Sequence, residues 1–585
     1  MVVQIGREAK GGSAYGRGGR RSSRESLTVN ELNGAEAMVR LLQRHGVKHV
    51  FGLCGDTSLP LYDALVRLDH GIRHILTRDE RHAGYMADAY ARFSGEVGVC
   101  EGPSGGGATY ILPALAEANE SSSPVLAINS DVSVSGRGRY VLTELDQQAL
   151  FRPVTKWNAV IDSAAQLPGM VRRAFREMRS GRPGAVHLGL PFDVQKAAVD
   201  EREVWADEVP PARPAPALAS LIGFSERLLA ARRPLAICGG GVIAAGAEEE
   251  LRLLAESLRM GVATTISGKG SIPEDHPLAV GVVGSNGGTP ETRALVDAAD
   301  LILFVGCRAG SVTTERWRHP VPGSKTVLHI DIDPAVPGTN YPTAATIVAD
   351  AREALATLLA QLRDRAVEIA DPALDIAAAK AAKLAAFTEL AVSDEAPIRP
   401  ERVVAALDRL LDDDAVVVAD PGTPCPYFSA YWRARRPGRQ FLSNRAHGAL
   451  GYALPAIVGA AIARPGAKPV AVMGDGSFGM ACGELETIAR LRLPVTLVVI
   501  SNATFGWIKA GQKSGFGARY FGVDFGRTRH AAVAEAFGLG AFEVDRPDQV
   551  EPTLRKALAM AEPVLVDIVC QPLHEARAPV SEWVA

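Results

Sequence analysis

Short apolar runs alternate with helical patterns along almost the whole chain. The runs are rich in valine, isoleucine and leucine and lie at residues 97–100, 125–128, 185–190, 235–238, 301–305 and 470–473. Strands that are apolar on both faces are typical of parallel sheets, and the helices between the strands cover those faces. The sequence therefore predicts an α/β protein made of doubly wound parallel sheets.

Chain length and two interruptions divide this pattern into blocks. A chain of 585 residues is too long for one hydrophobic core. The proline-rich stretch 209–216 indicates an exposed linker, and a second break is expected within the alanine-rich helical region 371–400. We expect three domains, at residues 28–205, 215–365 and 395–575.

The first 27 residues are rich in glycine, serine and arginine and contain no apolar segment. They do not have the pattern of a secretory signal, and we expect them to form a disordered tail. An organelle transit peptide is the alternative interpretation.

Charge, hydropathy and cysteine spacing argue against several classes of protein. A net charge of −3 gives no broad electrostatic attraction to nucleic acid or to an anionic membrane. No apolar run approaches the 18 or so residues that a membrane-spanning helix needs. The seven cysteines are scattered without a CxxC pair, which indicates neither a disulfide framework nor a zinc site. A reducing cytoplasm is the expected compartment.

A strand, a glycine-rich turn and a helix start follow one another at residues 469–488. The apolar strand 469–473 leads into the sequence Gly-Asp-Gly-Ser at 474–477 and then into a helical pattern. Glycines allow the backbone to approach a ligand closely, and the amides at a helix start favour phosphate. Asp475 adds a carboxylate oxygen of the kind that Mg²⁺ prefers.

A second polar group is expected beside Asp475. The strand 495–500 ends at the sequence Ser-Asn-Ala-Thr-Phe-Gly (501–506), and Asn502 lies 502 − 475 = 27 residues after Asp475. One strand-helix-strand crossover spans that gap, so both side chains should emerge at the carboxyl edge of neighbouring parallel strands. The pair can share one metal ion that bridges a diphosphate.

Together these two segments resemble the diphosphate and magnesium motif of thiamine diphosphate enzymes. Ser501 stands where that motif usually has its first asparagine, outside the implied ligand set. The resemblance implies that the metal is bound by the side chains of Asp475 and Asn502 and by the backbone carbonyl of Thr504. It places the cofactor at Gly474, Gly476, Ser477, Asn502 and Gly506.

A carboxylate at the start of a small-residue helix is the candidate catalytic group. The segment 77–92 resembles the HEQAAAHAADGYAR segment of the acetolactate synthase and pyruvate decarboxylase superfamily, with Glu80 eight residues before Asp88 and Asp79 in place of the usual histidine. Thiamine diphosphate needs a carboxyl group that shares a proton with its aminopyrimidine ring. Apolar surroundings would raise the pKa of Glu80 and suit it to that role.

Further matches extend the resemblance over nearly the whole chain. Residues 51–55 resemble FGxPG, 105–109 resemble GPGAT, 152–157 resemble RPITK and 448–456 resemble GTMGYGLPA. The last segment implies that Leu450 wedges the cofactor into its bent form and that the Gly448 carbonyl receives the pyrimidine amino group. Gly422 and Thr423, after the strand 415–419, are implied to line the diphosphate.

The resemblance also assigns the three blocks. It implies a pyrimidine-binding domain at 28–205, a central domain at 215–365 and a diphosphate-binding domain at 395–575. Central domains of this kind hold FAD or an adenine nucleotide in some relatives. The flavin-associated RFDDR segment is not seen after Gly306, so a structural domain without nucleotide is the alternative.

The sequence resembles acetolactate synthase large subunits most closely, which implies a carboligase that decarboxylates a 2-oxo acid and then forms a carbon-carbon bond. Two departures leave a non-ligating 2-oxo acid decarboxylase or lyase as the alternative: Thr143 replaces an active-site glutamine, and Asp56 resembles the PGD segment of simple decarboxylases. The expected substrate pocket contains Asp56, Gly105, Gly106, Thr143, Trp507 and Ile508.

A non-catalytic nucleotide-binding homologue is the remote third interpretation. The presence of Glu80, Asp475 and Asn502 argues against it. The family implies a homodimer or homotetramer in which Glu80 of one subunit faces the Asp475 motif of another.

Overall fold

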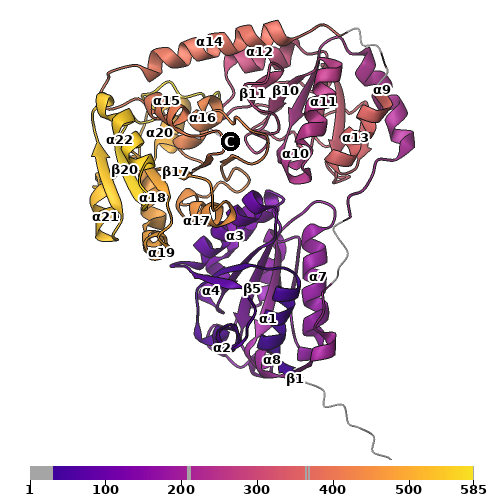
Figure 1. Ribbon diagram of the computed structural model, residues 1–585, viewed down its shortest axis with the longest axis vertical. Helices are drawn as coiled ribbons and strands as arrows, with labels where there is room; N and C mark the ends of the chain where they lie inside the picture. Colours follow the sequence, from indigo (N-terminus) through magenta and orange to yellow (C-terminus); the bar gives the residue numbers. More distant parts are fainter. Residues whose placement is uncertain (1–30, 207–211, 363–364, 366–368, 584–585) are drawn as a thin grey trace, which may run out of the picture.

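Figure 1 shows the computed structural model of the protein, which describes residues 31–206, 212–362, 365 and 369–583. The expected N-terminal tail and the first three residues of the expected linker lie outside these ranges. The described residues contain three six-stranded parallel sheets, which confirms the predicted α/β class. No helix in the described part of the chain combines the length and apolar character needed to cross a membrane.

The first and third sheets have the same strand order. The first runs β3 (Arg73–Leu76), β2 (His49–Gly52), β4 (Gly98–Gly102), β5 (Val125–Asp131), β7 (Val186–Pro191) and β6 (Trp157–Val160). The third runs β16 (Phe441–Leu442), β15 (Val416–Ala419), β17 (Pro469–Gly474), β18 (Thr496–Ser501), β20 (Val564–Val569) and β19 (Gly540–Val544). In both sheets the order reverses beside the first strand, between β2 and β4 and between β15 and β17. Ligands of open parallel sheets bind at such a reversal.

The middle sheet has a different order. It runs β11 (Ala279–Val282), β10 (Gly261–Thr264), β9 (Pro234–Cys238), β12 (Leu301–Val305), β13 (Thr326–Asp331) and β14 (Ala345–Val348), so the reversal lies between β9 and β12. This is the order of dinucleotide-binding folds. A short antiparallel pair, β1 (Glu31–Asn33) and β8 (Ala198–Asp200), lies outside the three sheets.

Helices between the strands cover the sheets, as the sequence predicts. Those of the first block are α1 (Gly34–Arg44), α2 (Leu59–Arg67), α3 (Glu80–Ser94), α4 (Gly106–Tyr110), α5 (Leu112–Glu120), α6 (Gln147–Phe151), α7 (Leu167–Arg179) and α8 (Phe192–Lys196). Those of the second are α9 (Leu218–Ala230), α10 (Gly240–Ala245), α11 (Glu248–Leu258), α12 (Pro290–Ala298) and α13 (Ala351–Leu362). Those of the third are α15 (Pro400–Leu410), α16 (Pro424–Tyr431), α17 (Ala453–Ala463), α18 (Asp475–Ala481), α19 (Leu485–Leu491), α20 (Gly506–Gly515), α21 (His530–Ala536) and α22 (Val550–Leu558).

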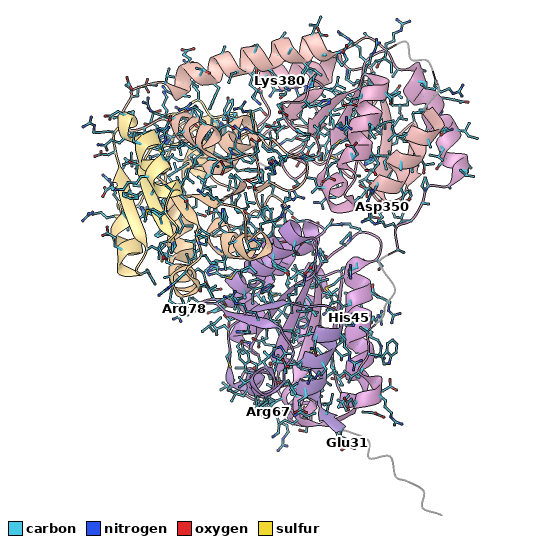
Figure 2. All side chains as sticks on the ribbon, in the orientation of Figure 1. Glu31, His45, Arg67, Arg78, Asp350 and Lys380 are labelled. Carbon is cyan, nitrogen blue, oxygen red and sulfur yellow. The ribbon has the colours of Figure 1, made fainter. Side chains whose placement is uncertain are left out.

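The alanine-rich region expected to contain a break forms one long helix, α14 (Ala373–Ala391). It runs along the upper edge of the molecule from the middle sheet to the third (Figure 1). The ammonium group of Lys380, labelled in Figure 2, donates to the backbone oxygens of Glu274 at 2.8 Å and His276 at 2.9 Å. The helix is therefore attached to the segment between β10 and β11.

Helices α3 and α17 bring the first and third sheets together through backbone contact. A Cβ atom on Gly459 of α17 would overlap the carbonyl oxygen of Met86 in α3, and one on Gly98 of β4 would overlap that of Ala87. Only glycine permits such an approach of one backbone to another. The abundance of small residues in these segments thus has a direct structural cause.

Replacing Gly459 with alanine should destabilise the protein by about 1–3 kcal/mol, because a backbone oxygen cannot move aside as a flexible side chain would. Gly169 in helix α7 is the matched control, because no atom lies within 4 Å of the position of an added Cβ. Gly169→Ala should leave stability unchanged or raise it by up to about 1 kcal/mol. Thermal unfolding of both variants tests this, and equal melting temperatures would contradict the close α3–α17 contact.

Candidate active site

A pocket of about 230 Å³ opens where the strand order of the third sheet reverses. The residues that follow β15 and β17 line it, together with the loop before α17 and the start of α20. Most residues predicted from the third block lie here: Gly422, Thr423, Gly448, Leu450, Gly474, Asp475, Gly476, Ser477, Thr504, Gly506, Trp507 and Ile508.

Asp475 is held by the backbone that follows the neighbouring strand. Its Oδ2 atom accepts the N–H groups of Asn502 at 2.7 Å and Ala503 at 2.6 Å, and Oδ1 accepts that of Gly476 at 2.9 Å. Because β17 and β18 are parallel neighbours, the structure confirms that the two predicted positions meet at one edge. Burial raises the pKa of Asp475, and the three N–H groups oppose that shift.

Asn502 has a side chain whose polar atoms are free to bind a ligand. Both polar atoms of its side chain are buried without a hydrogen-bond partner in the described residues. A carboxylate, an amide oxygen and a backbone carbonyl are oxygen donors of the type that Mg²⁺ selects. Elsewhere among the described residues, no three His, Cys, Asp or Glu side chains converge as a metal site. The residues present therefore fit a magnesium ion at this edge.

Ser501 has a structural role beneath the pocket. Its hydroxyl donates to Asp567 of β20 at 2.5 Å and lies 3.0 Å from Nδ1 of His530. Burial disfavours the charge of Asp567, but hydrogen bonds with His530 and Ser501 keep its pKa below the ordinary value. The serine thus connects two strands and helix α21, and it lies apart from the candidate ligands.

Asp420 organises the start of helix α17. Its Oδ1 atom accepts the N–H groups of Tyr452 at 3.0 Å and Ala453 at 2.9 Å. Burial raises the pKa of Asp420 to about 6, against the opposing hydrogen bond with Ser477. Asp420 follows the strand directly but was not among the site residues predicted from the sequence. The contacts across 32 residues explain why no local pattern revealed it.

Leu450 and Gly448 lie in the loop that Asp420 supports. Leu450 is partly buried and faces the pocket, and its Cδ2 atom would be 3.7 Å from a Cβ atom on Gly422. Gly448 has a φ of +74° and Gly451 a φ of +82°, a region that favours glycine. These two glycines allow the backbone to turn before and after Leu450.

Glu80 lies at the corresponding edge of the first sheet. It is 7% exposed and begins helix α3, and its side chain packs against Gly102, which ends β4, and against Gly107 of α4. Burial raises the pKa of Glu80, as the sequence analysis expected from apolar surroundings. A raised pKa favours the protonated form of this carboxyl group relative to an exposed glutamate.

The predicted first-block pocket residues surround a chain of hydroxyl groups. Gly105 has a φ of +66° and lies against Thr143. The Oγ1 atom of Thr143 is 2.7 Å from the Oγ atom of Ser104. Thr57 continues the chain at 3.1 Å. The exposed Asp56 accepts the N–H of Thr57, and an added Cβ on Gly106 would meet no atom within 4 Å.

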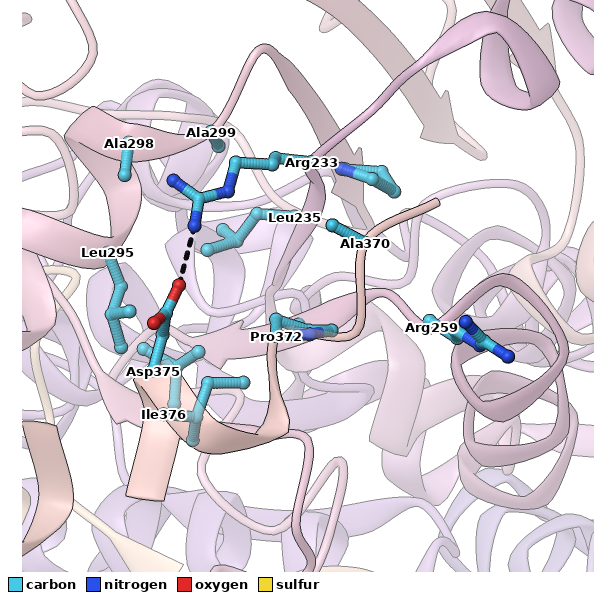
Figure 3. A pocket seen from close by; sticks show the side chains of 13 residues that line it. Arg233, Leu235, Arg259, Leu295, Ala298, Ala299, Ala370, Pro372, Asp375 and Ile376 are labelled. Atoms are coloured by element: carbon cyan, nitrogen blue, oxygen red, sulfur yellow. Dashed lines mark hydrogen bonds and ion pairs between the residues drawn. The ribbon is translucent and has the colours of Figure 1, made fainter. Parts of the chain in front are cut away.

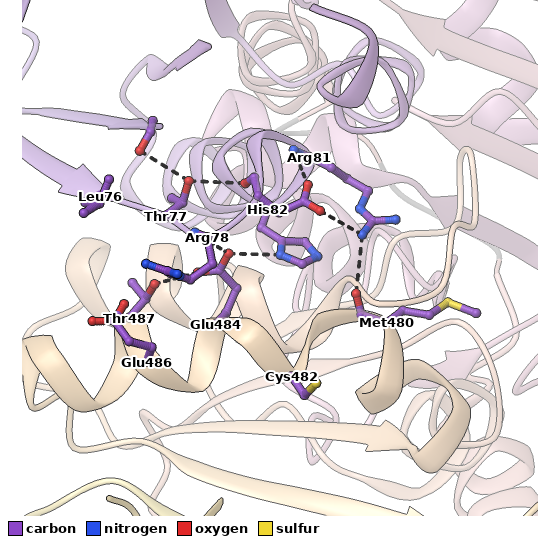
Figure 4. Close-up of polar contacts among 12 residues, drawn as sticks. Leu76, Thr77, Arg78, Arg81, His82, Met480, Cys482, Glu484, Glu486 and Thr487 are labelled. Atoms are coloured by element: carbon purple, nitrogen blue, oxygen red, sulfur yellow. Dashed lines mark hydrogen bonds and ion pairs between the residues drawn. The ribbon is translucent and has the colours of Figure 1, made fainter. Parts of the chain in front are cut away.

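The two halves of the site do not share one pocket in the described chain. None of Glu80, Asp56, Gly105, Gly106 and Thr143 lines the third-sheet pocket. The halves are instead connected from behind, where the buried Glu484 accepts the N–H of Arg78 at 2.9 Å and contacts His82 at 3.0 Å (Figure 4).

Two further charged residues belong to the site and were not predicted. Glu117 of α5 accepts the N–H groups of His447 at 2.7 Å and Gly448 at 3.3 Å. Arg445 lines the third-sheet pocket. Each is a single charged residue with no helical or strand periodicity to indicate its partner, so its role emerges only in three dimensions.

The glycines of the middle sheet are explained by packing. Added Cβ atoms on Gly239 and Gly241 would overlap the backbone of Gly306, so the loops after β9 and β12 touch directly. A small cavity of about 40 Å³ lies beside this sheet, bordered by the Arg233–Asp375 ion pair (Figure 3). Its volume is enough for a few water molecules and far too small for a nucleotide.

Asp420→Asn should remove a pH-dependent loss of stability. The pKa of Asp420 is raised to about 6 from 3.8, so the unfolded chain releases this proton at lower pH than the folded chain does. Stability linked to this group is therefore present below pH 4 and lost as pH rises through 6, by up to about 3 kcal/mol. The amide oxygen of asparagine keeps the two hydrogen bonds to α17.

Calorimetric melting temperatures of the cofactor-free protein from pH 4.5 to 8 measure this effect. The difference between Asp420→Asn and the original protein should grow with pH, and Asp414→Asn, at an exposed position, should show a constant difference. A pH-independent difference at Asp420 would contradict the raised pKa.

Comparison with known proteins agrees with this geometry. Residues 32–150 match the model of the thiamine pyrophosphate enzyme N-terminal TPP binding domain, residues 224–358 that of the central domain, and residues 420–568 that of the C-terminal TPP binding domain. The central match contains the whole middle sheet, and the other two matches contain four strands of the first sheet and most of the third.

Relatives of full length include proteins with two kinds of name. The chain is 36% identical over 562 residues to a probable acetolactate synthase large subunit of Methanocaldococcus jannaschii, with 92% of each chain covered. It is 33% identical to the acetolactate synthase isozyme 3 large subunit of Escherichia coli, covering 90% of this chain and 92% of that one. It is 36% identical to a probable 2-ketoarginine decarboxylase of Pseudomonas aeruginosa, covering 92% and 94%. The protein belongs to the family of thiamine pyrophosphate enzymes.

Proposed function

We propose that the protein is a carboligase that uses thiamine diphosphate and Mg²⁺ to decarboxylate a 2-oxo acid and form a carbon-carbon bond. Relatives named as acetolactate synthases support this proposal. The observation that carries the cofactor assignment is the unpartnered Asn502 side chain beside Asp475 at the strand-order reversal. When bound, the cofactor would supply the electron sink for the charge left by loss of carbon dioxide.

The proposal gives each site residue of the third block a position. Asp475, Asn502 and the Thr504 carbonyl would hold the metal ion. Leu450 would support the bent cofactor, and Gly448 would receive the pyrimidine amino group. The diphosphate would lie against Gly422, Thr423, Gly474, Gly476, Ser477 and Gly506.

Glu80 is the proposed catalytic residue. Its burial keeps water away and favours a shared proton, which it would hold against the aminopyrimidine ring. The substrate would lie among Asp56, Gly105, Gly106, Thr143, Trp507 and Ile508.

We further propose a homodimer or homotetramer in which Glu80 faces the Asp475 motif of the partner subunit. The absence of Glu80 from the lining of the pocket, within the described residues, supports this arrangement. Both edges also expose large apolar side chains, with Tyr110 60%, Leu142 82% and Ile508 55% exposed. The proposed domains are residues 28–205, 215–365 and 395–575, and the proposed compartment is the cytoplasm. We propose that the reaction needs no nucleotide in the central domain and that the protein binds neither nucleic acid nor a membrane.

A non-ligating 2-oxo acid decarboxylase is the second candidate. It is favoured by Asp56, which is exposed and immediately precedes Thr57, the residue whose hydroxyl continues the chain to Ser104 and Thr143. The relative named as a probable 2-ketoarginine decarboxylase supports the same reading.

Product analysis separates the two candidates. The protein is incubated with thiamine diphosphate, Mg²⁺ and pyruvate, with and without an aldehyde acceptor. Acetolactate or a mixed acyloin is the expected product, and free acetaldehyde alone would favour the decarboxylase. If pyruvate is not consumed, a panel of longer 2-oxo acids is tested in the same assay, and no turnover of any of them would reject both candidates.

Two variants test the site and its assembly. Glu80→Gln should bind the cofactor normally and lose about 10²- to 10⁴-fold in turnover, because it can no longer share a proton. Asp475→Ala should lose Mg²⁺-dependent retention of the cofactor, measured by equilibrium dialysis. Normal turnover of the first variant or normal retention by the second would remove that residue from its role.

Mixing the two inactive variants tests whether the site forms between subunits. After the subunits are exchanged, half of the dimers contain one of each chain and hence one intact site, so about a quarter of the original activity should return. A mixture that stays inactive although mass spectrometry shows mixed dimers would place the whole site in one subunit.

A further inference from the structure

Arg445 introduces a positive charge into a pocket otherwise lined by small, acidic and apolar residues. It lies in the loop between β16 and α17, and its Nη1 atom donates to the backbone oxygen of Pro421 at 3.1 Å. Nη2 contacts the side-chain oxygen of Asn286, a buried residue in the segment after β11 of the middle sheet. The guanidinium carbon is 5.9 Å from the centre of the Trp507 ring.

The guanidinium group has unused binding capacity. Its Nε atom is buried without a hydrogen-bond partner among the described residues. Every partner named above is neutral, and no carboxylate of the described chain lies within 4.0 Å of its nitrogens. A partly buried cation without a counter-charge is costly, and guanidinium groups bind carboxylates with strong, directional hydrogen bonds. The arrangement therefore suits an anionic ligand.

The proposed reaction involves three kinds of anion that Arg445 could bind: the cofactor diphosphate, the carboxylate lost as carbon dioxide and a second carboxylate of the substrate. The diphosphate is assigned to Gly422, Thr423, Gly474, Gly476, Ser477 and Gly506, whereas the guanidinium group also contacts Asn286 of the middle block and the ring of Trp507, which the proposed function places beside the substrate. A guanidinium paired with the carboxylate that leaves as carbon dioxide would stabilise the reactant and slow the reaction. An anion that stays on the substrate carries no such penalty.

We propose that Arg445 forms a subsite, with Trp507 and Asn286, for the distal carboxylate of a 2-oxo dicarboxylic acid. This inference rests on the proposed function, because it names the substrate class of that site. Trp507 would cover the aliphatic chain between the two carboxylates, and Arg445 would bind the far one. The protein would then select a diacid over a monoacid of equal length.

Kinetics with paired substrates test the proposal. The holoprotein should use 2-oxoglutarate with a higher kcat/KM than 2-oxopentanoate, which has the same chain length but no distal carboxylate. Arg445→Gln should reduce kcat/KM for 2-oxoglutarate by about 10- to 100-fold, the usual worth of a charge-assisted hydrogen bond. It should leave 2-oxopentanoate almost unaffected. Arg436→Gln, at an exposed position nine residues earlier, is the control and should change neither.

A binding measurement makes the test independent of turnover. Calorimetry with glutarate and with pentanoate, which has the same chain length, should show tighter binding of glutarate, and Arg445→Gln should remove that difference. Equal loss for both acids, or no preference of the original protein for glutarate, would overturn the subsite. A matching loss of thiamine diphosphate affinity in Arg445→Gln would show that Arg445 binds the cofactor instead, and would also overturn it.

The same measurements separate this inference from the proposed function. If the original protein fails to bind thiamine diphosphate, the proposed function is wrong, and calorimetry on the cofactor-free protein still decides whether Arg445 binds glutarate. If the cofactor binds and the diacid preference is absent, only the subsite is wrong.

Discussion

A buried guanidinium group joins the two sheets that carry the candidate site. Arg92 of α3 donates to Asp88 at 2.9 Å and to Glu117 at 3.1 Å, and both carboxylates are fully buried. The second oxygen of Asp88 accepts the hydroxyl of Tyr452 in the third block at 2.7 Å. That of Glu117 accepts the N–H of His447 at 2.7 Å. Separating the sheets would break the hydrogen bonds from Tyr452 and His447 to these carboxylates, each contributing about 1.5–3 kcal/mol because the acceptor is charged.

This network also explains why the cofactor loop has a defined shape without regular secondary structure. The loop before α17 contains glycines with positive φ and has little hydrogen bonding of its own. Glu117 binds its backbone from the first block, and Asp420 binds the helix start from the third. Glu117 and Asp420 thus fix the two ends of this loop, and Leu450 between them faces the pocket.

Much of the fold could be predicted because the relevant signals are local. The apolar run 301–305 corresponds to β12 residue for residue, and the run 495–500 differs from β18 by one position. The link between Asp475 and Asn502 followed from one crossover between adjacent strands, which is a rule of chain topology. The Glu80 segment depended on a resemblance, since an isolated glutamate at a helix start carries no comparable signal.

The remaining site residues could not be predicted because their partners are distant in sequence. Glu117 and His447 are separated by 330 residues, and Arg445 meets Asn286 across the boundary between the middle and third blocks. The roles of these residues depend on how the sheets pack against one another, and neither hydrophobic periodicity nor motif spacing predicts that packing. The equal strand order of the first and third sheets is likewise visible only when the strands have been placed.

The Glu484 contact has a consequence for how two sites in one assembly would communicate. Glu484 follows helix α18, which begins with Asp475, and its carboxylate binds the backbone of Arg78, two residues before Glu80. In the proposed assembly, with the site formed between subunits, Asp475 and Glu80 of one chain would serve different sites. A movement of α18 on loading one site would then reach the segment that carries the other site's acid through Glu484 and through Arg81, which donates to the backbone oxygen of Met480. Occupancy of one proposed site would thereby be coupled to the position of Glu80 in the other.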